Sequence, residues 1–166
     1  MSVVPGPGNK KRLSEWIDKY ERSLLHLCCM YLKDISLAED AVQETFLKAY
    51  QHMDSFRGES SEKSWLYRIA INACNDIRRS RWMRMFDRRV DIETLTIPVE
   101  GASDVSIALM EEIMRLPQKH REVIFLFYYE DMKLTEIAKL LGVPVSTVSD
   151  RLNRARALLR KALKGG

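Results

Sequence analysis

The sequence predicts an all-α protein made of two small helical domains joined by a flexible linker. Apolar residues recur at helical spacing over most of the 166 residues, and strand-like alternation is nowhere sustained. Between Trp82 and Ser106 the helical pattern disappears, and proline and glycine enter the chain. We therefore expect helical domains at residues 10–81 and 106–166, a linker at 82–105 and a disordered segment at 1–9.

The first domain is expected to begin with two amphipathic helices. The first runs from Leu13 to Lys33 and shows one apolar face: Leu13, Trp16, Ile17, Tyr20, Leu24, Leu27, Cys28 and Tyr31. Ser36 and Glu39 have capping-box spacing, so the second helix should begin there and run to about Met53. Its inward face is predicted to be Ala38, Ala41, Val42, Thr45, Phe46, Ala49 and Tyr50. Its outward face is predicted to be Asp40, Gln43, Glu44, Leu47 and Gln51.

A third helix should follow a polar loop at residues 56–62 and run from about Ser61 to Arg81. Its inward face is predicted to be Leu66, Ile69, Ala70, Ala73 and Ile77. Its outward face carries one polar stripe at helical spacing, made of Arg68, Asn72, Asn75 and Arg79. Trp65 borders the inward face, so core packing is favoured over a role as a stacking platform, and Tyr67 is left open between these two roles.

The second domain is expected to contain a helix at about Val105–Arg115 and another that starts at Pro117, a favoured first position. Its core is predicted to be Val123, Ile124, Phe127 and Tyr128. A short helix capped by Thr135 then leads to Gly142, where a left-handed turn costs glycine least. Ser146 should cap a last helix with one inward stripe: Val148, Leu152, Ala155 and Leu159.

The last helix is strongly basic: from Arg151 to the end there are six basic residues and no acidic one. A short helix, a glycine turn and a basic second helix match the helix-turn-helix, whose second helix enters the major groove of DNA. The alternative is a helical hairpin with a solvated basic face. Because arginines also gather between Arg78 and Arg89, two separate basic clusters indicate two contacts with a polyanion.

Composition argues against several other classes of protein. The three cysteines are odd in number and no zinc-ligand spacing occurs, so we expect buried thiols, no metal and no cofactor. An enzyme that uses His26, Cys28 and Cys29 is disfavoured, since no general base and no phosphate-binding glycine loop accompany them. With no apolar run of about 18 residues and no secretory leader, we expect a cytoplasmic protein without membrane insertion.

Two motif blocks, in this order, resemble a bacterial sigma factor. The first has D-x-x-Q-E on a helix and, after a polar loop, WLYRIAINACNDIRR. The second, after the linker, is LPQKHREVIFLFYYEDMKLTEIAKLLGVPVSTVSDRLNRAR. The short chain resembles the extracytoplasmic-function (ECF) type, in which residues 10–81 would be sigma domain 2 and residues 106–166 sigma domain 4. The resemblance implies a factor that binds core RNA polymerase, directs it to promoters and helps to open the duplex.

The resemblance assigns three groups of side chains. The surface for the clamp helices of the largest polymerase subunit would be Asp40, Gln43, Glu44 and Leu47. The contacts to the −10 element would be Arg57, Lys63, Arg68, Asn72, Asn75, Arg78 and Arg79. The contacts to the −35 element would be Ser146, Thr147, Ser149, Asp150, Arg151, Asn153, Arg154 and Arg156. The resemblance also implies contact with the flap region of the second-largest polymerase subunit.

The chemistry of these residues agrees with the assigned roles. Carboxylates beside an amide accept charge-assisted hydrogen bonds from arginines of a partner. Melting requires cations for the strand backbone and a pocket for an unstacked base, to which Asn72 and the preceding loop would contribute. In the last helix, Arg151, Arg154 and Arg156 are expected to hold phosphates and the earlier residues to meet base edges. Asp150 departs from the usual family pattern: an acid there accepts a hydrogen bond from cytosine or caps the helix, and it repels phosphate.

The main alternative is a helix-turn-helix repressor or activator with a ligand-sensing amino-terminal domain. It would bind operator DNA without polymerase, and it would have no reason to keep Asp40, Gln43 and Glu44 exposed. The sigma resemblance further implies an anti-sigma factor that covers the polymerase-binding faces of both domains and holds the protein inactive, in some cases near the membrane. A flexible linker permits that clamped arrangement.

Overall fold

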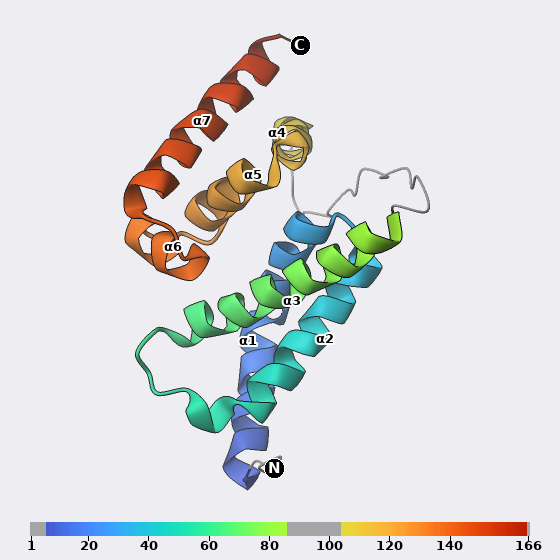
Figure 1. The fold of residues 1–166 in the computed structure, drawn as a ribbon, viewed down its shortest axis with the longest axis vertical. Coiled ribbons are helices and arrows are strands. Elements are labelled where there is room, and N and C mark those ends of the chain that lie inside the picture. Colours follow the sequence, from blue (N-terminus) through green and yellow to red (C-terminus); the bar gives the residue numbers. More distant parts are fainter. Residues whose placement is uncertain (1–5, 86–103, 166) are drawn as a thin grey trace. The chain divides into compact units, whose positions relative to one another are not determined.

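The computed structural model describes residues 6–85 and 104–165, and the side chains of residues 6–80 and 107–165. All regular elements in these ranges are helical, and the described residues fall into two compact units, residues 6–85 and residues 104–165 (Figure 1). The predicted all-α fold of two helical modules is therefore confirmed. Most of the predicted linker, and residues 1–5 of the predicted disordered segment, lie outside the described residues.

The first unit is a bundle of three helices that all contact one another. Its elements are α1 (Pro7–Leu32), α2 (Ile35–Gln51), the 3₁₀ turn η1 (Met53–Ser55) and α3 (Glu62–Met85). α1 begins before the predicted start at Leu13, because a proline in the first helical turn loses no hydrogen bond. Two residues of its predicted apolar face, Leu13 and Ile17, are half-buried, and the other six are buried.

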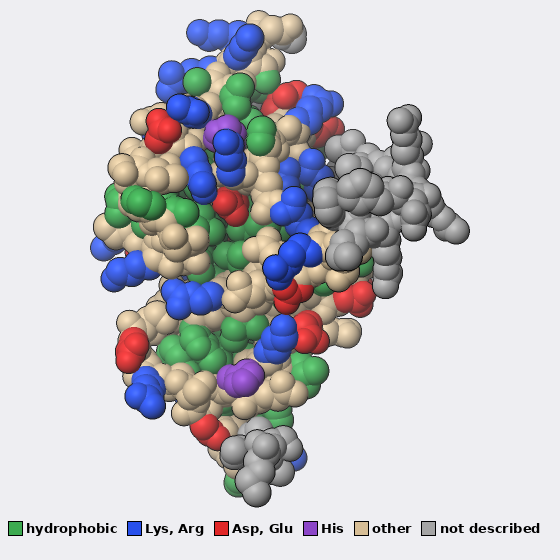
Figure 2. All heavy atoms as spheres, viewed as in Figure 1, with side chains coloured by type: hydrophobic (Ala, Val, Ile, Leu, Met, Phe, Trp, Pro, Cys, Tyr) green, Lys and Arg blue, Asp and Glu red, His purple; other side chains and the backbone are tan. Residues whose placement is uncertain are grey.

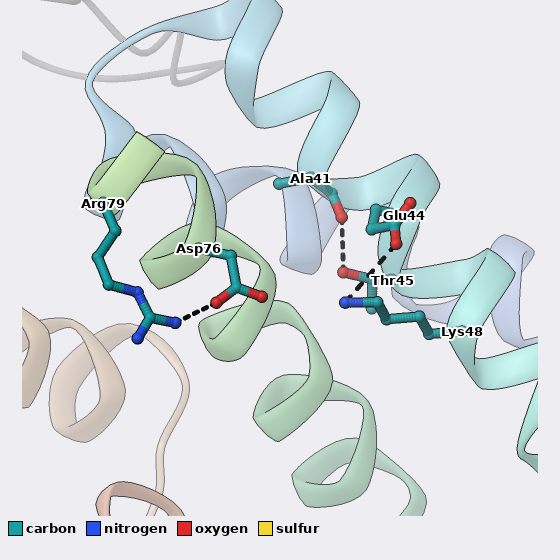
Figure 3. Close-up of polar contacts among 6 residues, drawn as sticks. All are labelled: Ala41, Glu44, Thr45, Lys48, Asp76 and Arg79. Atoms are coloured by element: carbon teal, nitrogen blue, oxygen red, sulfur yellow. Dashed lines mark hydrogen bonds and ion pairs between the residues drawn. The ribbon is translucent and has the colours of Figure 1, made fainter. Parts of the chain in front are cut away.

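α2 buries the predicted face and exposes the predicted polar one. Its buried residues are Ala38, Ala41, Val42, Thr45, Phe46 and Ala49, and Tyr50 is half-buried. The hydroxyl of Thr45 donates to the carbonyl of Ala41 at 2.6 Å, so this buried polar group is satisfied within its own helix (Figure 3). The predicted capping box is wrong: the helix is capped by Asp34, whose carboxylate accepts a hydrogen bond from the backbone N–H of Leu37 at 3.0 Å.

The buried face of α3 is broader than its periodicity predicts. Ile69 and Ile77, predicted to face inward, are half-buried, and Tyr67 is fully buried and belongs to the core. The reason is that α3 contacts both α1 and α2, so a wider arc of its surface is covered. The buried side chains are Leu66, Tyr67, Ala70, Ile71, Ala73 and Cys74.

The three cysteines are buried in this bundle as free thiols, as predicted. A side-chain contact with Cys74 and burial raise the pKa of Cys28. Burial also raises the pKa of Cys29 to about 11. Because the thiolate is the reactive form of cysteine, the raised pKa of Cys28 and of Cys29 disfavours reaction at these two thiols.

The second unit is organised around its long last helix, which contacts α4, α5 and α6. Its elements are α4 (Asp104–Arg115), α5 (Gln118–Ile124), the π-helical turn η2 (Phe125–Tyr129), α6 (Leu134–Leu141) and α7 (Val145–Lys164). Pro117 is the residue before α5 rather than its first helical residue. The predicted inward stripe of α7, Val148, Leu152, Ala155 and Leu159, is buried throughout.

Two of the four residues predicted to form the core of this unit are not buried. Val123 and Ile124 are buried as predicted, but Phe127 is half-buried and Tyr128 is 53% exposed. The π-helical turn places more residues in each turn than an α-helix does, so the residues after Ile124 are rotated relative to the 3.6-residue period. Phe125 and Leu126 fill the core in their place.

α6 and α7 form the predicted helix-turn-helix. Gly142 has φ 68° and its N–H bonds the carbonyl of Ala138, which is the left-handed end that was predicted for α6. The predicted caps are each wrong by two residues, because α6 begins after Lys133 rather than Thr135 and α7 begins after Pro144 rather than Ser146. Glu136 accepts a hydrogen bond at 3.4 Å from the backbone N–H of Lys133, so its carboxylate does serve the start of α6.

Candidate polymerase and nucleic-acid interfaces

The four predicted polymerase-binding residues lie together on the exposed side of α2, which we name the α2 face: Asp40, Gln43, Glu44 and Leu47. Leu47 is 52% exposed, and Glu44 forms an ion pair with Lys48 at 3.6 Å along the same helix (Figure 3). An exposed leucine among carboxylates and an amide offers a partner helix apolar contact and charge-assisted hydrogen bonds at once. The exposure of this face is what the prediction required, while its binding role stays a prediction.

The predicted −10 contacts follow α3 and the loop before it. Arg79 forms an ion pair with Asp76 one turn away (Figure 3), and the ammonium of Lys63 lies 5.5 Å from the centre of the Tyr67 ring. The side chains of Arg81 and Arg84, in the predicted arginine cluster, lie outside the described residues. Of the seven predicted contacts, Arg57, Arg68, Asn72, Arg78 and Arg79 are exposed, and Lys63 and Asn75 are half-buried.

Trp65 packs in a cluster with two other aromatic rings, as predicted for a core role. Its ring centre lies 5.6 Å from that of Trp16 and 5.1 Å from that of Phe56. The rings are tilted against one another, an arrangement that aromatic pairs favour. The cluster therefore joins α1, the first residue of the loop and the first turns of α3.

The predicted −35 contacts surround the first half of α7. Ser146, Asp150, Asn153 and Arg154 are exposed, and Thr147, Ser149, Arg151 and Arg156 are half-buried. Figure 2 shows basic side chains, in blue, spread over the face that this view presents of the α4–α7 unit. A helix with polar side chains near its start and arginines further along suits entry into a groove with phosphates on either side.

Arg151 forms an ion pair with another residue of the second unit. Its guanidinium lies 3.7 Å from the Glu122 carboxylate, with the two side chains 26% and 11% exposed. Glu122 belongs to α5, so this pair links α5 to the helix that is expected to read DNA. We therefore expect Arg151 to help hold α7 against α5, a role that its predicted contact with phosphate does not include.

Asp150 and Arg154 form an exposed ion pair at 3.4 Å, one helical turn apart. This explains how an acid is accommodated on a face that is expected to approach phosphates, because its charge is balanced locally. Asp150 lies in the second turn of α7, so it does not cap the helix as one prediction had it. Exposed pairs of this kind contribute little stability, about 0.3–0.5 kcal/mol, and Arg154 can exchange Asp150 for a phosphate at small cost.

Arg156 is held by the two aromatic residues that were wrongly predicted to be core. Its Nε donates to the Tyr128 hydroxyl at 2.7 Å, and its guanidinium lies 5.6 Å and 5.5 Å from the ring centres of Phe127 and Tyr128. A further bond, of 3.4 Å, joins it to the side-chain oxygen of Asn153. An arginine has five N–H donors, so one that is fixed in this way still has donors for a phosphate.

A run of three buried polar residues in α5, which sequence reasoning missed, lies behind this surface: His120, Arg121 and Glu122. Arg121 donates to the carbonyls of Met114 and Leu116 at 3.3 Å and 3.0 Å, so it closes the end of α4. Neither ring nitrogen of His120 has a hydrogen-bond partner among the described residues. Burial lowers the pKa of His120, and the nearby cations Lys119, Arg154 and Arg151 lower it further, against the opposing effect of Asp150.

The fold and these surfaces define a helical protein of two modules, one with a helix-turn-helix suited to duplex DNA. Residues 16–84 match the sigma-70 region 2 family model, and residues 106–159 match the sigma-70 region 4 model. The chain is 34% identical to the ECF RNA polymerase sigma factor SigW of Bacillus subtilis, over 95% of this chain and 91% of SigW. It is 31% identical to the RNA polymerase sigma-H factor of Pseudomonas aeruginosa, over 95% of this chain and 89% of that protein. The protein belongs to the sigma-70 family and is a sigma factor of the ECF type, which acts in promoter-specific transcription initiation with RNA polymerase.

Solved structures support the same assignment. The sigma factor RpoE of Bartonella quintana, in complex with the anti-sigma factor NepR, aligns with a TM-score of 0.83 at 25% identity, over 93% of this chain and 98% of RpoE. CnrH, in complex with the cytosolic domain of CnrY, aligns with a TM-score of 0.68 at 25% identity, over 95% of this chain and 91% of CnrH. Sigma factors are regulatory proteins, so the family assignment favours neither the ligand-sensing repressor nor the thiol-dependent enzyme.

The described part of the chain lacks two further features. No helix in residues 6–85 and 104–165 is long and apolar enough to cross a membrane. In the same ranges, no three His, Cys, Asp or Glu side chains gather so that they could hold a metal ion.

Replacing Arg151 is expected to loosen the second module. Arg151→Ala removes an ion-pair partner from the nearly buried Glu122 and should destabilise the contact between α5 and α7 by about 1–2 kcal/mol. Amide hydrogen exchange of α5 and α7 in the full-length protein would measure this as roughly tenfold faster exchange. Arg154→Ala removes the same charge from an exposed pair and should leave exchange unchanged within about twofold. Equal effects of the two substitutions would contradict the positioning role of Arg151.

The second module is expected to lose stability as the pH decreases below neutral, because of His120. Since burial lowers its pKa in the folded state below the ordinary 6.5, the unfolded chain takes up the proton first. Stability is then highest above pH 6.5 and is lost as the pH falls from 6.5 toward the lower, folded-state value. His120→Leu should reduce the drop in melting temperature between pH 7.5 and pH 5.0, whereas His52→Gln, at an exposed site, should preserve it. The same drop in all three proteins would show that His120 does not carry the effect.

Proposed function

We propose that the α2 face binds the clamp helices of the largest polymerase subunit. The single observation that carries this proposal is the exposure of Asp40, Gln43, Glu44 and Leu47 on one side of a helix whose other side is buried. A rigid helix holds these groups in fixed register, so arginines of a partner helix meet them without an ordering cost. The flap region of the second-largest subunit is proposed as the partner of the second module.

The loop after η1 and the exposed stripe of α3 are proposed to hold the −10 element as a single strand. Arg57, Lys63, Arg68, Arg78 and Arg79 supply cations for the strand backbone. Asn72 and Asn75 supply amides that can donate and accept hydrogen bonds at a base edge. Because the stripe follows one helix, successive residues can meet successive nucleotides, and the strand is held apart from its complement.

The first half of α7 is proposed to read the −35 element in the major groove. Ser146, Thr147, Ser149 and Asn153 are placed for base edges, and Asp150 can accept a hydrogen bond from the amino group of cytosine. Arg154 and Arg156 are proposed as phosphate contacts. Arg151 acts behind them through Glu122, so we assign it to the orientation of the reading helix rather than to DNA.

We further propose that an anti-sigma factor covers the polymerase-binding surfaces and keeps this protein inactive. The structural relatives RpoE and CnrH were each solved with a partner, NepR and CnrY, which supports this kind of control. Since a sigma factor acts with polymerase on the chromosome, the cytoplasm is its proposed place of action, and a membrane-bound inhibitor would hold it close to the membrane. We assign it no catalytic step and no cofactor.

Run-off transcription with purified core polymerase and a pool of genomic fragments tests the docking proposal. Asp40→Arg together with Glu44→Arg places cations where the clamp helices are expected to offer arginines, so specific transcripts should fall at least tenfold. The matched control, Asp18→Arg with Glu21→Arg, reverses two exposed acids on α1 and should leave transcripts within about twofold. Unchanged transcripts with the α2 pair reversed would show that the polymerase docks elsewhere.

A further inference from the structure

Arg12 of α1 contacts both ends of the loop between η1 and α3. At the start of the loop its guanidinium carbon lies 5.5 Å from the centre of the Phe56 ring. At the end of the loop its guanidinium nitrogen lies 3.4 Å from the carboxylate of Glu62, the first residue of α3. The same guanidinium lies 4.9 Å from the centre of the Trp16 ring, on its own helix. One side chain thus joins the amino-terminal part of α1 to the two points where the loop leaves and re-enters helical structure.

The surroundings of Arg12 hold these two points in place. The rings of Trp16, Phe56 and Trp65 form the aromatic cluster beside it, with centres 5.1–6.4 Å apart. One turn before Arg12, the side-chain amide of Asn9 donates to the carboxylate of Asp54 at 2.9 Å, just ahead of the loop. The first part of α1 is therefore a support for the loop rather than a free extension of the helix.

The loop between the two anchored ends has few such supports of its own. Gly58 has φ 75°, a left-handed conformation, and a side chain added there would meet nothing within 4 Å. Arg57 and Glu59 are exposed on either side of it. The position of Arg57 relative to the polar stripe of α3 consequently depends on how firmly Phe56 and Glu62 are held.

A guanidinium group can contact Phe56 and Glu62 at the same time, and an ammonium group cannot. A planar guanidinium can lie against two aromatic rings while its edge faces a carboxylate, whereas an ammonium is a compact charge that serves one partner at a time. Arg12 and Glu62 are each a little more than one-third exposed, so the ion pair alone is weak. The combination of ring contacts and ion pair on one group is what distinguishes Arg12 from the neighbouring lysines.

We infer that Arg12 is a positioning residue for recognition of the −10 element. It acts through Phe56 and Glu62 to hold the loop that carries Arg57 in register with the stripe of α3, and it does not itself contact a base. This inference rests on the proposed role of the loop and α3 in holding the −10 strand. It predicts that loss of Arg12 impairs discrimination between −10 sequences more than it impairs polymerase binding.

The test compares Arg12→Ala, Arg12→Lys and the control Lys11→Ala, which removes a charge from the adjacent exposed position. Each full-length protein is assembled with core polymerase, and transcription is measured from a promoter recovered from the genomic pool and from single-base variants of its −10 element. We expect Arg12→Ala to reduce the ratio of cognate to variant transcripts at least threefold, with polymerase affinity within twofold of wild type. Arg12→Lys should resemble the alanine variant, because it keeps the charge and loses the planar stacking, and Lys11→Ala should keep the wild-type ratio.

Amide hydrogen exchange separates a positioning effect from loss of the fold. Arg12→Ala should speed exchange in residues 57–61 and leave the buried helices of the first module unchanged. An unchanged transcript ratio, or faster exchange throughout α1–α3, would overturn the inference. The proposed function has a separate test in Arg57→Ala, which should also reduce the ratio of cognate to variant transcripts. A wild-type ratio in Arg57→Ala would show that the −10 assignment of the loop is wrong. A reduced ratio in Arg57→Ala with an unchanged ratio in Arg12→Ala would be evidence against Arg12 alone.

Discussion

The packing of one side of α2 against α1 and α3 is the constraint on which the first module depends. Alanines at three positions of that side let the neighbouring helices come close, and Thr45 satisfies its hydroxyl within the helix. Because a helix with one side buried in this way must turn its opposite side to solvent, the carboxylates, amide and leucine of the α2 face are displayed in fixed register. The same bundle fixes α3, whose polar stripe is displayed by the same logic.

The second module depends on apolar burial and on polar contacts in different ways. The stripe from Val148 to Leu159 attaches α7 to the other helices, but a stripe of this kind leaves the helix some freedom to rotate and slide. The ion pair between Arg151 and Glu122 and the contacts of Arg156 with Tyr128 are directional, so they limit that freedom. Because α7 is proposed to meet base edges, its orientation benefits from both kinds of contact.

The helical fold, the two modules and most buried faces could be predicted from the sequence, since each depends on the periodicity of residues close in the chain. The inward stripe of α7 and the turn at Gly142 are examples, because a regular spacing and a left-handed glycine are local signals. The cap at Asp34 was missed because Ser36, two residues later, also has a capping side chain. The start of α6 was missed because Lys133 caps it without a side-chain hydrogen bond, so the sequence carries no capping signal there. The π-helical turn was missed because nothing in the sequence FLFYY distinguishes it from an α-helical turn, and the error exchanged Tyr128 for Leu126 in the core.

The candidate surfaces could be predicted only as groups of residues. Resemblance to a family assigned roles to the α2 face and to the first half of α7. The structure added which of these residues also contact other side chains of this protein. The contact of Arg12 with Phe56 and Glu62 joins residues far apart in the sequence, and no pattern in the sequence around Arg12 predicts it. The pairing of Glu122 with Arg151 was missed for the same reason. From the sequence, an acidic residue in α5 is expected to be exposed, and only the packing of α7 against α5 buries it.

We propose that the two modules act in one complex, in which one binds the polymerase while the other binds duplex DNA. The most direct measurement is photocrosslinking of a full promoter complex, with a photoreactive phenylalanine analogue in place of Leu47 or of Asn153. We expect the probe at position 47 to capture a polymerase subunit and the probe at position 153 to capture promoter DNA. Capture of DNA from position 47, or of polymerase alone from position 153, would contradict it.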